Sequence, residues 1–95
     1  MNGHGNWTVK KRKAADRELA GLPTQLREEA NSVLNELAED GPAIFGAIEM
    51  RGNPNTWRVR FGGGFRIVYR VFEKQRKILV TRIGPRGTVY KGLRG

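Results

Sequence analysis

Residues 57–71 carry the sequence WRVRFGGGFRIVYRV, and this stretch decides the fold. Apolar and polar side chains alternate through Trp57–Phe61, and apolar residues again take every second position through Phe65–Val71. A period of two is typical of β-strands, whose successive side chains point to opposite faces. The three glycines between the runs indicate a short turn, and strands joined by a short turn must be antiparallel. The stretch therefore predicts an antiparallel β-hairpin.

Outward from this hairpin, the sequence predicts a third strand at residues 77–83, after a turn at 73–76. Earlier in the chain, apolar residues between positions 15 and 38 recur at three- and four-residue steps, which is the pattern of amphipathic helices. Gly-Leu-Pro at 21–23 separates two such helices, and Asp-Gly-Pro at 40–42 ends the second. A short β-prone segment, residues 7–10, precedes them.

These elements give the order β-α-α-β-β-β, which predicts an α+β fold. We expect a helical hairpin packed on one face of a mostly antiparallel, twisted sheet. Nothing repeats and no linker divides the chain, so residues 1–95 are predicted to form a single domain, of which residues 1–6 are flexible. Gly84-Pro85 is expected to stop the last strand and to leave Arg86 and Tyr90 on a restricted segment near the sheet edge.

Charge is divided unequally between the two halves of the chain. Residues 1–50 have 6 Lys and Arg against 8 Asp and Glu, whereas residues 51–95 have 12 against the single acid Glu73. The first half therefore has a net charge of −2 and the second a net charge of +11. Most of the basic residues in the second half are arginines, which bind phosphate through two parallel hydrogen bonds. A polyanion, nucleic acid above all, is the expected partner.

Composition excludes several classes of function. The chain has no cysteine, which rules out thiol chemistry and Cys-ligated zinc and favours a reducing cytoplasm. Its single histidine, His4, lies in a Gly-rich N-terminus, so no metal site and no cofactor are expected. No apolar run is long enough for a membrane span or a signal peptide. We expect a cytoplasmic protein without membrane contact.

Arginines alternate with apolar residues on the predicted hairpin, so Arg58 and Arg60 share one face, and Arg66 and Arg70 share a face of the next strand. An ordinary solvated face explains any one of them. Solubility does not explain the four arginines together, because a face chosen for solubility alone mixes acids with bases.

Gly62-Gly63-Gly64 is interpreted as a turn, since neither a Lys-Ser/Thr pair nor a helix follows as in phosphate-binding loops.

Several motifs together resemble the RelE/ParE superfamily of bacterial toxins from type II toxin–antitoxin pairs. The resemblance covers about residues 7–91 and includes Leu-Pro between the helices and Asp-Gly-Pro after them. Its most specific part is the run Gly-Phe-Arg-Ile-Val-Tyr-Arg at 64–70, followed by a strand that ends in Ile-Gly-Pro-Arg at 83–86. Met-Arg-Gly at 50–52, Trp-Arg-Val-Arg at 57–60 and the later Tyr90 complete it. The superfamily includes ribosome-dependent mRNA endonucleases and gyrase poisons.

The resemblance implies which residues act in the endonucleases of this superfamily. The positions that match their catalytic residues are Arg58, Arg60, Arg66, Arg86 and Tyr90. The second-strand pair is Arg-Val-Arg where Lys is common, and the spacing from Arg86 to Tyr90 is short for the family. RNA binding is expected of a partly overlapping set: Arg51, Arg58, Arg60, Arg70 and Arg82.

The reaction that the resemblance implies is attack of a ribose 2′-hydroxyl on the adjacent phosphate of mRNA. Arg66 and Arg86 are expected to stabilise charge on the phosphate. A guanidinium stays protonated and is a poor general base, so Tyr90 is the expected proton-transfer residue. The implied partners are the ribosome, mRNA and an antitoxin whose acidic segment binds the toxin in a hetero-oligomer. A gyrase-inhibiting toxin without nuclease activity and a non-catalytic basic protein that binds RNA or a partner remain as alternatives.

Overall fold

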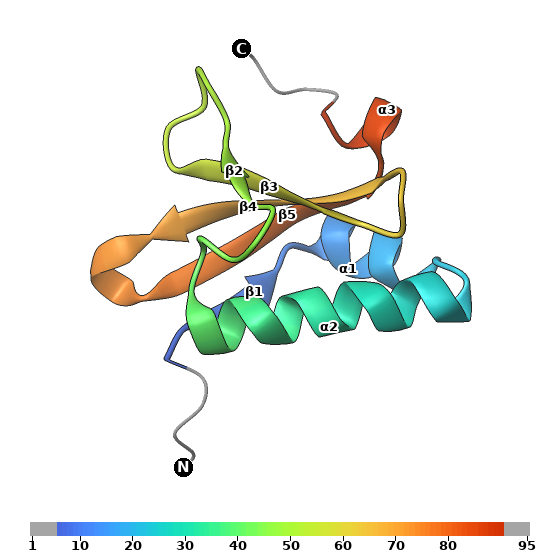
Figure 1. The fold of residues 1–95 in the computed structure, drawn as a ribbon, viewed down its shortest axis with the longest axis horizontal. Coiled ribbons are helices and arrows are strands. Elements are labelled where there is room, and N and C mark those ends of the chain that lie inside the picture. Colours follow the sequence, from blue (N-terminus) through green and yellow to red (C-terminus); the bar gives the residue numbers. More distant parts are fainter. Residues whose placement is uncertain (1–5, 91–95) are drawn as a thin grey trace.

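A computed structural model describes residues 6–90 of the chain. The predicted flexible segment 1–6 therefore lies outside the described residues, apart from Asn6. The described elements, in chain order, are β1 (Thr8–Lys11), α1 (Lys13–Ala20), α2 (Thr24–Asp40), β2 (Ile48–Glu49), β3 (Thr56–Phe61), β4 (Phe65–Phe72), a short 3-10 helix η1 (Glu73–Gln75), β5 (Lys77–Pro85) and α3 (Arg86–Val89). This is the α+β architecture that the sequence predicts, with β2 and α3 in addition (Figure 1).

The strands form a single five-stranded sheet in the order β1-β5-β4-β3-β2. The pairs β2–β3, β3–β4 and β4–β5 are antiparallel, and β1 pairs in parallel with β5. The predicted hairpin forms β3 and β4, with Arg60 opposite Arg66 and Phe61 opposite Phe65. The ladder between β4 and β5 contains an irregularity between Val68 and Tyr69. The sheet is therefore mostly antiparallel, as predicted.

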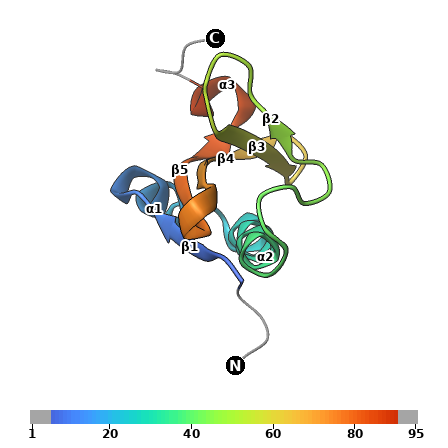
Figure 2. The same cartoon turned by 90° about the vertical axis from the view of Figure 1, so that its left-hand side faces the viewer.

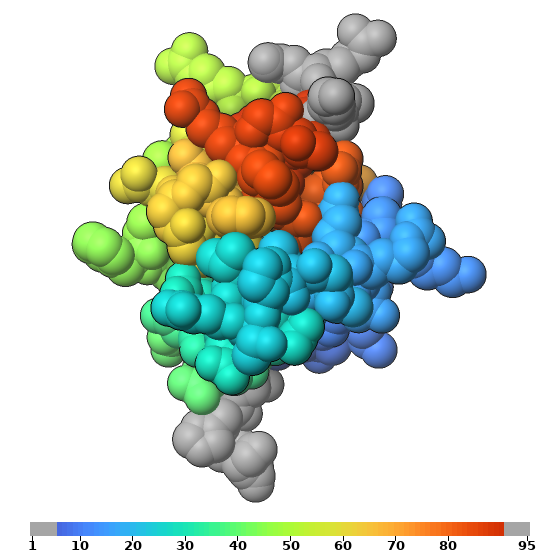
Figure 3. All heavy atoms as spheres, turned by 90° about the vertical axis from the view of Figure 1, so that its right-hand side faces the viewer, coloured from blue at the N-terminus to red at the C-terminus, as the bar shows by residue number. Residues whose placement is uncertain are grey.

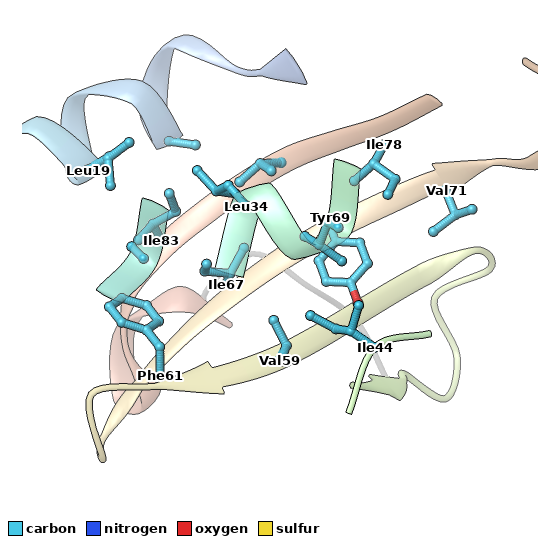
Figure 4. Packing of buried hydrophobic residues seen from close by; sticks show 14 residues of the cluster. Leu19, Leu34, Ile44, Val59, Phe61, Ile67, Tyr69, Val71, Ile78 and Ile83 are labelled. Carbon is cyan, nitrogen blue, oxygen red and sulfur yellow. The ribbon is translucent and has the colours of Figure 1, made fainter. Parts of the chain in front are cut away.

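Helices α1 and α2 cover one face of the sheet, while β2 and α3 lie on the other side of the molecule (Figures 1 and 2). The hydrophobic core fills the space between the helices and the sheet, as Figure 4 shows for Leu19, Leu34, Ile67 and Tyr69. Leu37, Ile67, Tyr69, Ile78 and Val80 are completely buried. No helix within residues 6–90 is long and apolar enough to cross a membrane.

Local sequence sets the limits of both helices. Helix α1 ends at Gly21, whose N–H donates to the carbonyl of Arg17 (3.0 Å), and Pro23 directly precedes α2. Helix α2 ends at Gly41, whose φ of +91° belongs to the region that favours glycine. A Cβ atom at Gly41 would lie 2.9 Å from Nε1 of Trp7, so glycine is also required by the close packing of the opening segment.

Two expectations about the connections and the tail are wrong. The connection at 43–55 contains the two-residue strand β2, in which Ile48 pairs with Arg58. Strand β5 continues through Gly84-Pro85 instead of stopping before it, because β1 pairs only with Lys77–Val80 and β5 is an edge strand at Pro85, where a residue without an N–H is tolerated. The tail then forms α3, which contacts β4 and β5.

Candidate functional site

A pocket of about 570 Å3 opens on the face of the sheet that the helices leave uncovered. The orientation follows from strand alternation, because Val59, Phe61 and Ile67 point into the core and their neighbours on β3 and β4 point away from it. The residues that line the pocket are Gly46, Ala47, Ile48, Met50, Arg58, Arg60, Arg66, Arg86 and Tyr90. The pocket thus brings together every residue predicted to be catalytic.

Three of these arginines come from the β3–β4 hairpin. Arg58 and Arg60 lie two positions apart on β3, and Arg60 is directly opposite Arg66 on β4. Arg66 is only 7% exposed, and its Nη1 donates to the carbonyls of Phe65 (3.1 Å) and Gly63 (3.5 Å). The carbonyls of Gly63 in the turn and of Phe65 at the start of β4 therefore hold the Arg66 guanidinium in place.

The segment after β5 adds the remaining two side chains, Arg86 at the start of α3 and Tyr90 directly after its end. The backbone N–H of Arg86 donates to the carbonyl of Gly64 (2.9 Å), which ties the start of α3 to the β3–β4 turn. Val89 is completely buried and lies against Gly84. Figure 3 shows the result, with the C-terminal segment packed against the hairpin and above the helices. These contacts hold Arg86 and Tyr90 beside the hairpin arginines.

Two polar atoms in the site are buried without a hydrogen-bond partner in the part of the chain that the structure describes: Nε of Arg66 and the hydroxyl of Tyr90. Each is a donor, and an unpaired buried donor costs about 1–3 kcal/mol. Native proteins keep few such groups, and a bound ligand or a catalytic role is one explanation for those that persist. An acceptor in the pocket would satisfy one or both.

The other predicted RNA-binding arginines lie outside the pocket. Arg51 is exposed in the loop after β2, and the guanidinium of Arg70 lies over the ring of Phe72, 5.5 Å from its centroid. Arg82 forms an ion pair with Glu18 of α1 at 2.9 Å, and the Glu18 carboxylate also accepts the backbone N–H of Ile83 at 2.8 Å. An acid from the first half of the chain therefore neutralises one arginine of the basic half.

The second wall of the pocket was not predicted. It consists of Gly46, Ala47, Ile48 and Met50, which belong to the connection that precedes β3. This segment has no periodic pattern, and its position depends on the pairing of β2 with β3. The one sequence signal is its apolar composition in a stretch without a predicted helix or strand.

The tyrosines differ in environment. The hydroxyl of Tyr69 donates to the carbonyl of Pro42 at 2.6 Å within the core, and burial raises the pKa of this hydroxyl. Tyr69 is therefore a structural hydrogen-bond donor. Tyr90 lines the pocket among four guanidinium groups, and no carboxylate from residues 6–90 lines it. Chemically, this arrangement is suited to hold an anionic phosphodiester and to exchange a proton through the Tyr90 hydroxyl.

Comparisons with known proteins identify the family and similar folds. Residues 9–90 match the family model described as ParE toxin of type II toxin-antitoxin system, parDE. The isolated RelE toxin of E. coli superposes with a TM-score of 0.73 at 24% identity, with 83% of each chain covered. The RelBE2 toxin-antitoxin complex of Mycobacterium tuberculosis gives 0.65 at 25% identity, with 84% of this chain and 98% of that chain covered. A YoeB/ParE toxin from Agrobacterium tumefaciens gives 0.71 at 16% identity, with coverage of 82% and 96%. A search of curated proteins found no match.

Proposed function

This chain belongs to the ParE toxin family of type II toxin–antitoxin systems, and from that premise we propose that it is a toxin that cleaves mRNA on the ribosome. The observation that carries the proposal is the convergence of Arg58, Arg60, Arg66, Arg86 and Tyr90 on a single pocket. They come from β3, β4 and the segment after β5, which are separate in sequence. A merely solvated face does not need such convergence, or the burial of Arg66.

In the proposed reaction, the 2′-hydroxyl of one ribose attacks the phosphorus of the next phosphodiester. The 2′-O–P bond forms as the P–O5′ bond breaks, which gives a 2′,3′-cyclic phosphate and a 5′-hydroxyl end. Arg66 and Arg86 bind the non-bridging oxygens and stabilise the charge that develops on them. The 2′-hydroxyl loses one proton and the departing 5′-oxygen gains one; Tyr90 mediates one of these two transfers and solvent water the other. Arg58 and Arg60 hold the flanking backbone.

The proposed partner is an antitoxin with an acidic segment that covers the basic pocket. The chain has a formal net charge of +9, and complementary charge accelerates association and selects partners. The M. tuberculosis structure to which this chain is similar is itself a toxin–antitoxin complex. Expression of the chain alone is expected to arrest bacterial growth, and coexpression with the antitoxin is expected to restore it.

Purified protein, ribosomes and mRNA provide the direct test. We expect cleavage of mRNA in the ribosomal A site, with a cyclic phosphate on the upstream fragment and a 5′-hydroxyl on the downstream one. The control variant is Arg70→Ala, which should cleave mRNA as the wild type does. Arg70 lies on the same strand as Arg66 but outside the pocket. Intact mRNA with wild-type protein would overturn the proposal.

A second candidate is a gyrase-inhibiting toxin without nuclease activity, and the match to a ParE family model favours it. That function needs a docking surface for gyrase but no proton-transfer group. DNA supercoiling by gyrase, measured with and without the protein, separates the two candidates. Inhibition of gyrase together with intact mRNA identifies the second candidate. If neither gyrase inhibition nor mRNA cleavage is observed, the remaining alternative is a non-catalytic basic binding protein.

A further inference from the structure

The large apolar side chains that are exposed within residues 6–90 lie on one short segment beside the pocket. They are Phe45, which is 100% exposed, and Ile48, which is 51% exposed. Ile48 lines the pocket, and Phe45 directly precedes Gly46, which also lines it. We call the four apolar residues Phe45, Ala47, Ile48 and Met50 the apolar rim.

The backbone on both sides of Phe45 is anchored. The carbonyl of Pro42 accepts the Tyr69 hydroxyl at 2.6 Å, and Ile44 is buried in the core. The N–H of Ala47 donates to the carbonyl of Ile44 at 3.0 Å, which closes a turn around Phe45. Ile48 then pairs with Arg58 on β3. The segment is thus held in place while the side chains of Phe45 and Ile48 face solvent.

The pocket therefore has two chemically different walls. One wall presents the guanidinium groups of Arg58, Arg60, Arg66 and Arg86, and the other presents Ala47, Ile48 and Met50 of the apolar rim, which Phe45 extends beyond the pocket. At about 570 Å3, the pocket has more room than one phosphate group fills. A ligand that suits both walls must join an anionic group to a flat apolar one. A nucleotide does so, because its base is attached through ribose to the phosphate.

We infer that the apolar rim binds the nucleobase next to the scissile phosphate and selects it by size; this inference rests on the proposed function. The rim side chains have neither donors nor acceptors, apart from the weakly accepting sulfur of Met50, so they do not read base edges. They contact the face of the base, as apolar and aromatic residues do in single-strand binding proteins. A purine covers more of the rim than a pyrimidine, so purines are preferred, with adenine and guanine equivalent.

The antitoxin is the competing occupant, since an acidic amphipathic segment also combines charge with apolar groups. The base is favoured because the unpaired donors of Arg66 and Tyr90 are buried in the pocket that the rim borders. A phosphate group that enters the pocket reaches these donors. The base that is attached to this phosphate then lies against the apolar rim. An antitoxin segment that covers the pocket would compete with the nucleotide for the same donors, so the base occupies the rim in the toxin that is free of antitoxin.

Binding of short oligonucleotides tests the inference without relying on cleavage. The probes are trinucleotides of adenosine, guanosine, uridine or cytidine and an abasic trimer, all with 2′-O-methyl ribose, which blocks the attacking hydroxyl. Wild-type protein should bind the purine trimers on the order of tenfold tighter than the abasic trimer, with pyrimidines between them. The double variant Phe45→Ala/Ile48→Ala should lose this preference. Both side chains are exposed, so the variant should fold, and thermal unfolding checks this.

The matched control is Leu79→Ala, because Leu79 is a half-buried strand residue that does not line the pocket. This variant should keep the base preference, whereas Arg66→Ala should weaken binding of every trimer equally. The inference is overturned if wild-type protein shows no preference for bases, or if the double variant retains it. It is also overturned if the double variant changes only the response to antitoxin. The proposed function fails separately, when wild-type protein leaves ribosome-bound mRNA intact.

Discussion

Arg60 and Arg66 lie directly opposite each other on β3 and β4, so two like charges form a cross-strand pair in the sheet. Like charges at opposed positions destabilise an antiparallel sheet. A phosphate bound between the two guanidinium groups would remove this repulsion. The pair therefore favours binding of an anion at some cost to the stability of the free protein.

Replacement of Arg60 by threonine, a residue well suited to strands, should stabilise the free protein and weaken RNA binding. The expected gain in free energy of unfolding is about 0.2–1 kcal/mol, measured by urea denaturation at low salt. Arg58→Thr is the matched control, because Val68 and not a charged residue is opposite Arg58 on β4. Equal gains for both variants would show that the Arg60–Arg66 pair is not the cause.

The ion pair between Arg82 and Glu18 predicts that Arg82 has little part in RNA binding. Both side chains are 28% exposed, and the pair joins α1 to β5. Affinity for RNA falls with salt in proportion to the number of cations that contact phosphate. Arg58→Ala should therefore reduce the salt dependence of RNA binding, whereas Arg82→Ala should leave it unchanged. If Arg82→Ala also reduces the salt dependence of RNA binding, Arg82 contacts RNA and this prediction is wrong.

The turn between β3 and β4 offers a matched pair of glycine substitutions. Gly62 and Gly63 both have positive φ, at +56° and +79°, but only a Cβ at Gly62 would collide with the side chain of Leu26 on α2. Gly63→Ala should cost only backbone strain, about 1 kcal/mol. Gly62→Ala should cost about 1 kcal/mol more, because Leu26 must shift. Thermal or urea unfolding of the two variants measures the difference, and equal losses would mean that Leu26 moves without cost.

The buried hydroxyl of Tyr69 predicts a dependence of stability on pH. Tyr69→Phe leaves the carbonyl of Pro42 unpaired and should cost about 1–3 kcal/mol near neutral pH. Burial raises the pKa of Tyr69 in the folded protein, so its contribution is present below the unfolded pKa of about 10 and is lost as pH rises further. Urea unfolding of both proteins between neutral and strongly alkaline pH should show the difference shrinking above about pH 10. A constant difference would contradict this assignment.

Strong local patterns made most of the fold predictable. The alternation in residues 57–71 gave the hairpin, and the apolar spacing before Asp40 gave both helices. By contrast, β2 has two residues and no measurable period, and α3 contains Gly87 and Thr88, which are weak helix formers. Helix α3 is held instead by the burial of Val89, which is a tertiary contact.

The candidate site was also predictable only in part, because local sequence patterns reveal strand faces but not tertiary contacts. Alternation along β3 placed Arg58 and Arg60 on one face, and the family resemblance added Arg86 and Tyr90. The pairing of Arg82 with Glu18 spans 64 positions, and no local pattern encodes a contact at that separation. The apolar rim likewise became visible only when β2 was placed beside β3.

The most direct test of the central claim is the single-turnover rate at which wild-type protein and Tyr90→Phe cleave mRNA in the ribosomal A site. The substitution removes one hydroxyl and should leave the fold intact, which thermal unfolding verifies. If Tyr90 transfers a proton while Arg66 and Arg86 hold the phosphate, Tyr90→Phe should cleave on the order of 100-fold more slowly, with ribosome binding unchanged. A rate near that of the wild type would contradict the role of Tyr90, and no cleavage by wild-type protein would contradict the nuclease assignment itself.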